Sequence, residues 1–257
     1  ALGLSQELLK AIQDAGYTEP TPIQSEAIPL VLAGHDLVGI AQTGTGKTAA
    51  FILPILAALT RPDTIRKPGG VRALVIAPTR ELVVQIEQNA RIYGRYLPVR
   101  TATVFGGVSE RPQIQALRSG AELVIATPGR LLDLMQQRCV NFSTLSHLVL
   151  DEADRMMDMG FLPDIRRIVR TLPHQRQTLF FSATLSSDIE AVTREFLRNP
   201  KLVQIGRRSN PAETVTQFVY EVAQHQRIEL LLNLLEDPKM NMVLVFTRTK
   251  HGADKVA

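Results

Sequence analysis

The stretch Asp36-Leu37-Val38-Gly39-Ile40-Ala41-Gln42-Thr43-Gly44-Thr45-Gly46-Lys47-Thr48 decides the fold of this 257-residue chain. Residues 36–41 form a short apolar run typical of a buried strand, and an apolar helical pattern follows over 47–59. Between them lies a glycine-rich turn, whose successive N–H groups can point at one anion at a helix N-terminus. The stretch therefore predicts a phosphate-binding loop, in which Lys47 reaches the β- and γ-phosphates and the Thr48 hydroxyl binds Mg²⁺.

One position departs from the usual signature of such a loop, because Ala41 stands where the first glycine is expected. The alternative is an ordinary glycine-rich turn followed by a chance Lys-Thr pair. Since a strand and a helix are both expected at its two ends, we favour the phosphate loop.

The rest of the first two hundred residues alternates short apolar runs with helical patterns. Expected strands are 36–41, 73–77, 101–105, 123–126, 147–151, 178–182 and 202–205, and expected helices are 5–15, one that begins at 22, 47–59, 80–94, 110–119, 129–137, 163–171 and 187–197. This alternation predicts a parallel sheet, and strands without an apolar–polar alternation predict helices on both of its faces. The fold class is therefore α/β, with ligands at the carboxyl ends of the strands.

Composition limits the class of protein without naming a partner. Hydrophobic residues make up 45% of the chain and charged residues 21%, which is close to globular averages and excludes wholesale disorder. A single cysteine excludes an internal disulfide framework, and no apolar run is long enough to cross a bilayer. The net charge of +4 permits a polyanionic partner but does not require one. We expect a soluble, cytoplasmic protein with no membrane partner.

A linker-like composition interrupts the alternation near residue 206. After it, the sequence predicts a strand over 215–222, a helix over 226–235, a strand over 242–246 and the start of a further helix. The length of the chain lies between one and two domains. We therefore predict a first domain over 1–206, a linker over 207–213 and a second, truncated domain over 214–257.

A second group of candidate catalytic residues follows the strand expected at 147–151. Asp151 ends this strand, where an acid that orients Mg²⁺ is expected, and Glu152 is placed to position or deprotonate an attacking water. The alternative is a run of acids that caps the next helix. Together with Lys47 and Thr48 in the same sheet, the acids favour a nucleoside triphosphatase.

With Asp151-Glu152-Ala153-Asp154 the chain resembles the DEAD-box ATP-dependent RNA helicases of superfamily 2. The resemblance implies a RecA-like fold of the P-loop NTPase class, with ATP and Mg²⁺ as cofactors and the Mg²⁺ held by Thr48 and, through water, by Asp151. Residues 16–24 are similar to the adenine-reading Q motif of the family, in which Tyr17 stacks on the base and Gln24 reads its edge. The implied ATP-binding residues are Tyr17, Gln24, Gln42, Thr43, Gly44, Thr45, Gly46, Lys47 and Thr48, and the implied catalytic residues are Lys47, Asp151 and Glu152.

Three further segments resemble the RNA-contacting motifs of the family, and each follows an expected strand. They offer small groups, N–H donors at a helix start and two arginines, which suits a sugar-phosphate backbone rather than base edges. Taken alone, Gly-Gly and Thr-Pro-Gly are more typical of ordinary turns. The implied RNA-binding residues are Pro78, Thr79, Arg80, Gly106, Gly107, Thr127, Pro128, Gly129 and Arg130.

Residues 182–184, Ser-Ala-Thr, resemble the motif that couples ATP to RNA separation, which implies that the hydroxyls of Ser182 and Thr184 pair with Asp154. The alternative is a cap on the helix that follows. Residues 244–250 resemble the motif that opens the family's second RecA-like domain. The residues at 154–161 are most similar to those of the bacterial RhlE branch.

Two elements of the family pattern fall outside the sequence. An aromatic residue upstream of the Q motif would precede Ala1, and the later motifs of the second domain, with their arginine fingers, would follow Ala257. We therefore expect an incomplete second RecA-like domain, and a chain that binds nucleotide but hydrolyses it weakly.

The resemblance implies an RNA-stimulated ATPase that separates short RNA duplexes locally or remodels RNA–protein complexes, without reading RNA sequence. Ribosomal or RNA-decay proteins are candidate partners. Two alternatives stay open: a DNA translocase built on the same ATPase fold, and an ATP-gated clamp that holds RNA without unwinding it.

Overall fold

The computed structural model describes residues 2–61, 70–206, 216, 218–238 and 240–256. The chain divides into two compact units, Ala1–Ser209 and Asn210–Ala257. The linker predicted at 207–213 lies outside the described residues.

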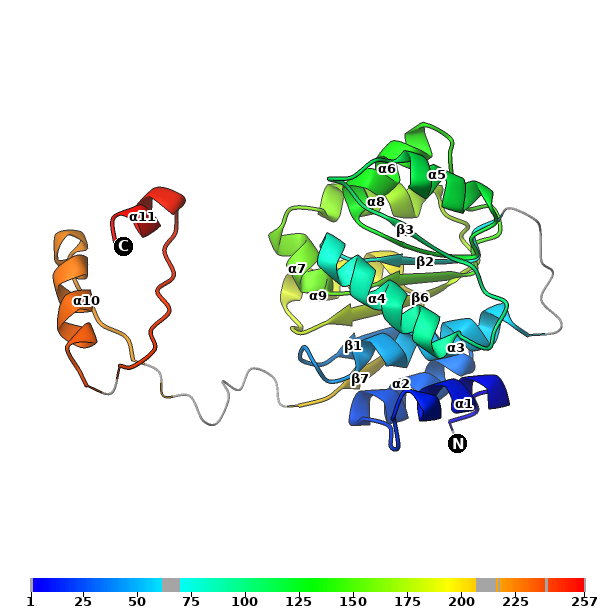
Figure 1. Cartoon of the computed structure of the whole chain (residues 1–257), viewed down its shortest axis with the longest axis horizontal. Helices are drawn as coiled ribbons and strands as arrows, with labels where there is room; N and C mark the ends of the chain where they lie inside the picture. The colour runs from blue at the N-terminus through cyan, green and yellow to red at the C-terminus, as the bar shows by residue number, and fades with distance from the viewer. Residues whose placement is uncertain (1, 62–69, 207–215, 217, 239, 257) are drawn as a thin grey trace. The chain divides into compact units, whose positions relative to one another are not determined.

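The described part of the first unit is built on one seven-stranded sheet (Figure 1). The order across the sheet is β3-β4-β2-β5-β6-β1-β7, and every neighbouring pair of strands is parallel. The carboxyl ends of all strands therefore lie at one edge, and the predicted parallel α/β fold is confirmed. The strands are β1 (Leu37–Ile40), β2 (Ala73–Ile76), β3 (Thr101–Val104), β4 (Leu123–Ala126), β5 (His147–Leu150), β6 (Gln177–Ser182) and β7 (Lys201–Gln204).

Helices cover both faces of this sheet, as predicted. One face packs against α1 (Gln6–Asp14), α2 (Pro22–Leu32), α3 (Lys47–Leu59) and α4 (Arg80–Tyr93). The other packs against α5 (Arg111–Arg118), α6 (Pro128–Gln136), α7 (Ala153–Asp158), α8 (Leu162–Thr171) and α9 (Ser187–Phe196). The short helix α7 was not expected, because six residues are too few to show a helical period.

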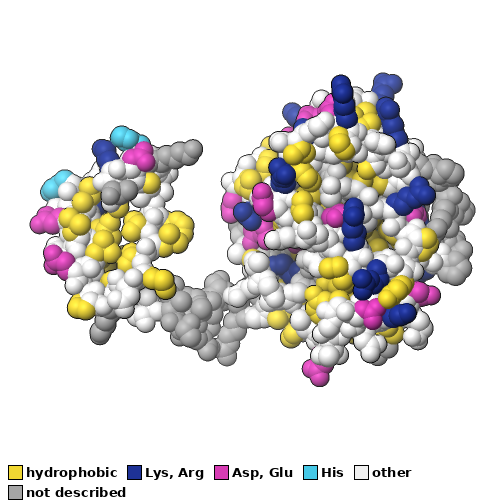
Figure 2. All heavy atoms as spheres, viewed as in Figure 1, with side chains coloured by type: hydrophobic (Ala, Val, Ile, Leu, Met, Phe, Trp, Pro, Cys, Tyr) yellow, Lys and Arg dark blue, Asp and Glu magenta, His cyan; other side chains and the backbone are white. Residues whose placement is uncertain are grey.

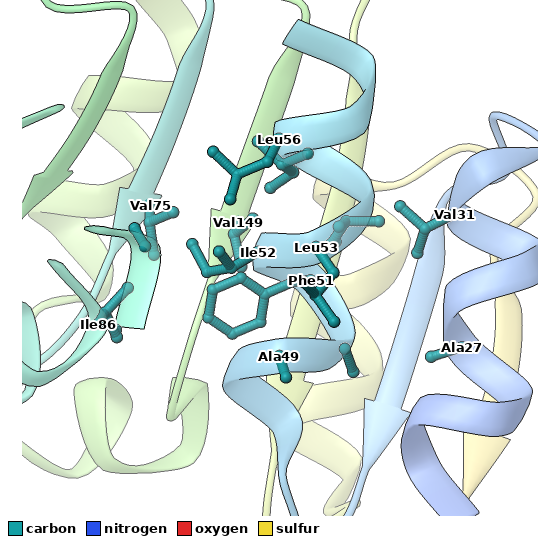
Figure 3. Close-up of a cluster of buried hydrophobic side chains, with 14 of the residues drawn as sticks. Ala27, Val31, Ala49, Phe51, Ile52, Leu53, Leu56, Val75, Ile86 and Val149 are labelled. Carbon is teal, nitrogen blue, oxygen red and sulfur yellow. The ribbon is translucent and has the colours of Figure 1, made fainter. Parts of the chain in front are cut away.

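Side chains of each inner strand alternate between the two faces of the sheet. In β2, Ala73 and Val75 belong to the cluster with α3, whereas Leu74 and Ile76 belong to the cluster on the other face. Figure 3 shows Val75 beside Phe51 and Ile52 of α3. The inner strands β1, β2 and β4 are buried throughout, and β5 and β6 are buried after a half-buried first residue. The edge strand β3 alternates between buried and half-buried residues. The absence of alternation in the inner strands therefore correctly predicted helices on both faces of the sheet.

The second unit contains a 3₁₀ helix, η1 (Gln224–Gln226), and the helices α10 (Arg227–Leu235) and α11 (Lys250–Asp254). The strands predicted at 215–222 and 242–246 are wrong for the residues that the structure describes there. A strand needs a neighbour for its N–H and C=O groups, and no described segment pairs with either run. Their apolar side chains, such as Val219 and Phe246, are exposed, and α10 buries none of its leucines. Figure 2 shows hydrophobic side chains on the surface of this unit.

No described helix combines the length and the apolar character that crossing a bilayer requires.

Gly39 in β1 tests how tightly the core on the α3 face is packed. A Cβ atom at this position would lie 2.5 Å from a ring carbon of Phe181, whose ring also packs on Phe51 with centroids 5.3 Å apart. We expect Gly39→Ala to lower the free energy of unfolding by about 1–3 kcal/mol through overpacking. In a Phe181→Leu background the same change should cost less than half as much, because the new methyl group then has room. Urea unfolding of the four chains checks this cycle, and strictly additive costs would contradict the packing assigned to Gly39.

Candidate functional site

The strand order divides the carboxyl edge of the sheet into two halves. Adjacent strands β5, β6 and β1 are followed by the segments 151–154, 183–184 and 41–46, which form the phosphate-loop half. Segment 151–154, which runs into the start of α7, is the acid loop. Adjacent strands β3, β4 and β2 end in the loops at 105–110, 127 and 77–79, which form the glycine half. Pairing of β2 with β5 joins the two halves. The structure thus brings the predicted ATP and coupling motifs together, and the predicted RNA motifs together beside them.

Two glycines give the loop at 41–46 its shape. Gly44 and Gly46 have φ values of 82° and 91°, which L-residues with a side chain rarely adopt, and α3 begins directly after Gly46. Ala41 is not among the residues with positive φ, and its N–H donates to the Ser182 carbonyl at 3.1 Å as a continuation of the β1–β6 ladder. Alanine therefore replaces the usual first glycine without backbone strain.

Lys47 lies buried in the first turn of α3, and its Nζ donates to the Ala41 carbonyl. Burial lowers the pKa of Lys47, while the carboxyl groups of Asp151, Asp154 and Glu152 oppose this shift. The ammonium group is thus held within the phosphate loop by one carbonyl and by the acids that follow β5, two strands away from β1 in the sheet. A phosphate placed at this helix N-terminus would offer it a stronger, charged acceptor.

Asp151 follows β5 and is only 2% exposed. Burial raises the pKa of Asp151 to about 7, although the charge of Lys47 acts in the opposite direction. Its Oδ1 accepts a hydrogen bond from the Glu152 N–H at 3.0 Å. With Lys47 as its only cationic influence among the described residues, the carboxyl group of Asp151 therefore holds a proton up to about neutral pH.

Glu152 has φ 50° and ψ 50°, in the left-handed region, which costs a residue other than glycine about 1–2 kcal/mol. Such strain persists where surrounding contacts hold it, and it concentrates at functional sites. Here Asp151 Oδ1 accepts from the Glu152 N–H, and Arg155 Nη1 donates to Glu152 Oε2 at 3.1 Å. The sequence pattern gave no signal for this Arg155 contact, because Arg155 matches no site chemistry on its own.

Asp154 joins the acid loop to the end of β6. Its Oδ2 accepts from the N–H groups of Ala183 and Thr184 at 3.1 Å each, and from the Thr184 hydroxyl at 3.2 Å. The implied pairing with Thr184 is present. The hydroxyl of Ser182 does not reach Asp154, because it accepts from the Thr184 N–H at 3.3 Å, within its own turn.

Gln24 packs directly on the phosphate loop. Its Nε2 donates to the Gly46 carbonyl at 3.1 Å, and its Oε1 accepts from the Thr21 N–H at 3.1 Å. A Cβ atom on Gly46 would lie 2.4 Å from Gln24 Nε2, so Gly46 is required both by its φ and by this neighbour. The amide keeps one N–H and one lone pair for a ligand, which still permits the predicted recognition of an adenine edge.

Tyr17 presents half of its side chain to solvent and meets Tyr93 edge to face, with ring centroids 6.0 Å apart and hydroxyl oxygens 3.3 Å apart. Burial raises the pKa of Tyr93, and the hydrogen bond that its hydroxyl donates to the Tyr17 oxygen adds to the shift. A cavity of about 310 Å³ beside these rings has mainly apolar walls and includes Gln24, but none of residues 41–48 lines it. The exposed ring of Tyr17 is free to stack on a base. The contact with Tyr93 was not expected, because no motif includes Tyr93.

In the glycine half, the predicted RNA-binding residues differ in how far they face outward. Arg80, Gly106, Gly107 and Gly129 are exposed, and Thr79 and Thr127 are half-buried N-caps of α4 and α6. Pro78 and Pro128 are buried. The side chain of Arg130 is 15% exposed and donates from Nη1 to the Val108 carbonyl at 3.1 Å, so it faces the neighbouring loop.

Asp151→Asn tests the raised pKa of Asp151. The folded chain keeps this proton up to about pH 7, whereas the unfolded chain loses it near the ordinary pKa of 3.8, so the folded state binds more protons between these values. The free energy of unfolding of the parent should therefore fall relative to Asp151→Asn as the pH rises from about 4 to about 7, by up to about 1.4 kcal/mol per pH unit, and level off above. Urea unfolding of both nucleotide-free chains across this range measures the difference. A difference independent of pH would contradict the assignment.

Comparison with known proteins agrees with this geometry. The family model described as DEAD/DEAH box helicase matches residues 21–192. The chain is 43% identical over 257 residues to DEAD-box ATP-dependent RNA helicase 20 of Arabidopsis thaliana, covering 99% of this chain and 51% of that protein. It is 44% identical over 258 residues to ATP-dependent RNA helicase RhlB of Pseudomonas putida, covering 98% and 65%.

A solved structure supports the same fold. The hypothetical ATP-dependent RNA helicase from Sulfolobus tokodaii superposes with a TM-score of 0.71 at 37% identity, covering 79% of this chain and 57% of that one. The first unit is therefore RecA-like, as predicted, and the chain spans between 51% and 65% of the length of these three proteins. The family model covers more than half of the sequence, and the chain belongs to the DEAD/DEAH box helicase family.

Proposed function

We propose that this chain is the ATP-binding and RNA-binding part of an ATP-dependent RNA helicase, which couples ATP hydrolysis to local separation of short RNA duplexes or to remodelling of RNA–protein complexes. The proposal rests on the two halves of the carboxyl edge. One half carries the phosphate loop and the acids, and the other carries exposed glycines and an arginine. In the sheet, β6 lies between β1, which leads into the phosphate loop, and β5, which leads into the acids. The residues that follow β6 bond to Asp154. Loss of the γ-phosphate can therefore alter the end of β6 directly.

The residues of the phosphate-loop half fit ATP with Mg²⁺. Among the described residues no cluster of three or more His, Cys, Asp or Glu could hold a metal alone. Mg²⁺ does not need one beside a nucleotide, since it binds through one or two carboxylates, phosphate oxygens and water. Thr48 and Asp151 would hold the ion, which when bound would neutralise charge on the phosphates. Lys47 would contact the phosphates, and Glu152 would accept the proton of the attacking water.

Two exposed glycines carry the RNA part of the proposal. Neither Gly106 nor Gly129 has a positive φ, and a Cβ atom on either would meet no atom within 4 Å. Gly129 even lies in the first turn of α6, where glycine is less favourable than alanine by about 1 kcal/mol. No contact within the described part of the chain explains these glycines, whereas a ligand backbone that approaches closely would. Exposed Arg80 nearby suits a phosphate of such a backbone.

The finer assignments stay predictions. They comprise the RhlE branch, contacts with ribosomal or RNA-decay proteins, a cytoplasmic location, and a second RecA-like domain from residue 214. A DNA translocase is the main alternative. Comparing single-stranded RNA with DNA of equal length distinguishes it, because the proposal expects tighter binding of RNA.

Gly129→Ala separates stability from RNA binding. The substitution should raise the free energy of unfolding by about 0.5–1 kcal/mol, because alanine is the better helix residue, and at the same time weaken binding of single-stranded RNA. Gln136→Ala, at the exposed far end of the same helix, is the matched control and should leave RNA affinity unchanged. Urea unfolding and fluorescence anisotropy with labelled RNA measure the two effects. Unchanged RNA affinity in Gly129→Ala would remove the main support for RNA at this surface.

Glu152→Gln tests the role of the second acid. The amide cannot accept the proton of an attacking water, so ATP turnover in the presence of RNA should fall by about 10²-fold or more. Affinity for a fluorescent ADP analogue should stay within about twofold, because Glu152 is not placed on the phosphate loop. If the variant still hydrolyses ATP at the parental rate, Glu152 has a different role.

A further inference from the structure

The loop at 105–109 is held by a residue outside the motifs already described. Phe105 follows the last residue of β3, and both of its backbone polar groups bond to one side chain. Gln113 Oε1 accepts from the Phe105 N–H at 3.1 Å, and Gln113 Nε2 donates to the Phe105 carbonyl at 3.0 Å. Gln113 therefore satisfies the N–H and the carbonyl of Phe105, as the backbone of a neighbouring strand would.

The second N–H of the same amide bonds to the far end of the loop. Gln113 Nε2 also lies 3.3 Å from the Ser109 carbonyl, so one side chain bonds to both ends of the exposed segment Gly106–Val108. Gln113 belongs to α5 and is only 7% exposed, which fixes it from the core side. A glutamine amide offers two donors and two lone pairs, and this position uses both donors and one lone pair.

Two arginines of the glycine half contact the same loop. The guanidinium of Arg80 lies over the Phe105 ring, 5.1 Å from its centroid, and Arg130 bonds to the Val108 carbonyl. The loop is thus fixed from α4, α5 and α6. Since Gln113 sets the backbone of Phe105, it also places the ring on which Arg80 rests.

We propose that Gln113 is a positioning residue for RNA binding, which holds Gly106, Gly107 and Arg80 as one preformed surface for the RNA backbone. This inference rests on the proposed function. Ordering a free residue costs about 1–2 kcal/mol, so a loop that had to be ordered on binding would bind RNA more weakly. Gln113 removes that cost before RNA arrives, without touching the RNA itself.

Gln113→Met tests the inference, because methionine has a similar length but cannot make these hydrogen bonds. Gln115→Met, two residues along α5 at an exposed position, is the matched control. The affinity of each chain for labelled oligouridylate is measured with a non-hydrolysable ATP analogue and Mg²⁺, beside affinity for fluorescent ADP and hydrogen exchange of the Phe105 amide. We expect Gln113→Met to bind RNA about tenfold more weakly or worse, with ADP affinity within about twofold and faster exchange at Phe105. Gln115→Met should match the parent.

The outcomes separate this inference from the proposed function. If the parent itself does not bind oligouridylate, the proposed function fails. If the parent binds and Gln113→Met binds equally well despite faster exchange at Phe105, the positioning role is overturned. It is also overturned if ADP affinity falls together with RNA affinity, since Gln113 would then support the whole unit. Should Gln113→Met not fold, Gln113→Asn carries the same readouts, because it keeps the amide but is too short to reach both groups of Phe105.

Discussion

The parallel pairing of β6 between β1 and β5 is the constraint on which the rest of the structure depends. Leu37 of β1 lies opposite Leu179, and Leu148 of β5 opposite Thr178, so the three strands run in register to the same edge. Because both faces pack against helices, a shift of one residue would exchange the side chains of two closely packed clusters, which holds the register in place. The phosphate loop, the end of β6 and the acid loop are therefore neighbours because of the sheet, before any side chain of the site makes a contact.

The site itself costs the fold stability. Lys47 and Asp151 are ionisable groups held away from water, and Glu152 has a left-handed backbone. Their pKa shifts have the same main cause, burial, which disfavours the charged form of each. A bound nucleotide with its cation would supply the opposite charges that the free chain lacks. Ion pairing of Arg155 with Glu152 and the hydrogen bonds to Asp154 keep the acid loop ordered until then.

How much of this could be predicted from the sequence depends on the range of the interactions. Residues 36–59 specify a strand, a glycine turn and a helix through neighbouring residues, and the structure has all three. The strand order depends on residues that are far apart in the sequence. The sequence therefore predicted that the motifs share one edge of the sheet, but not that they occupy two separate halves of it. Contacts of Gln24 with Gly46 and of Gln113 with Phe105 join different elements through a side-chain amide, a pattern that no periodicity reveals. Apolar runs such as 242–246 predicted strands, but a strand also needs a partner, and none of the described residues supplies one.

The most direct measurement is a pair of hydrogen-exchange footprints on this chain, one with a non-hydrolysable ATP analogue and Mg²⁺, and one with single-stranded RNA added to it. The structure predicts that nucleotide slows exchange at 41–48 and 151–154, and that RNA then slows it at 78–80, 105–109 and 127–130, next to the nucleotide footprint on the same edge. If RNA slowed exchange elsewhere and left 105–109 and 127–130 unchanged, the division of the edge into an ATP half and an RNA half would be contradicted.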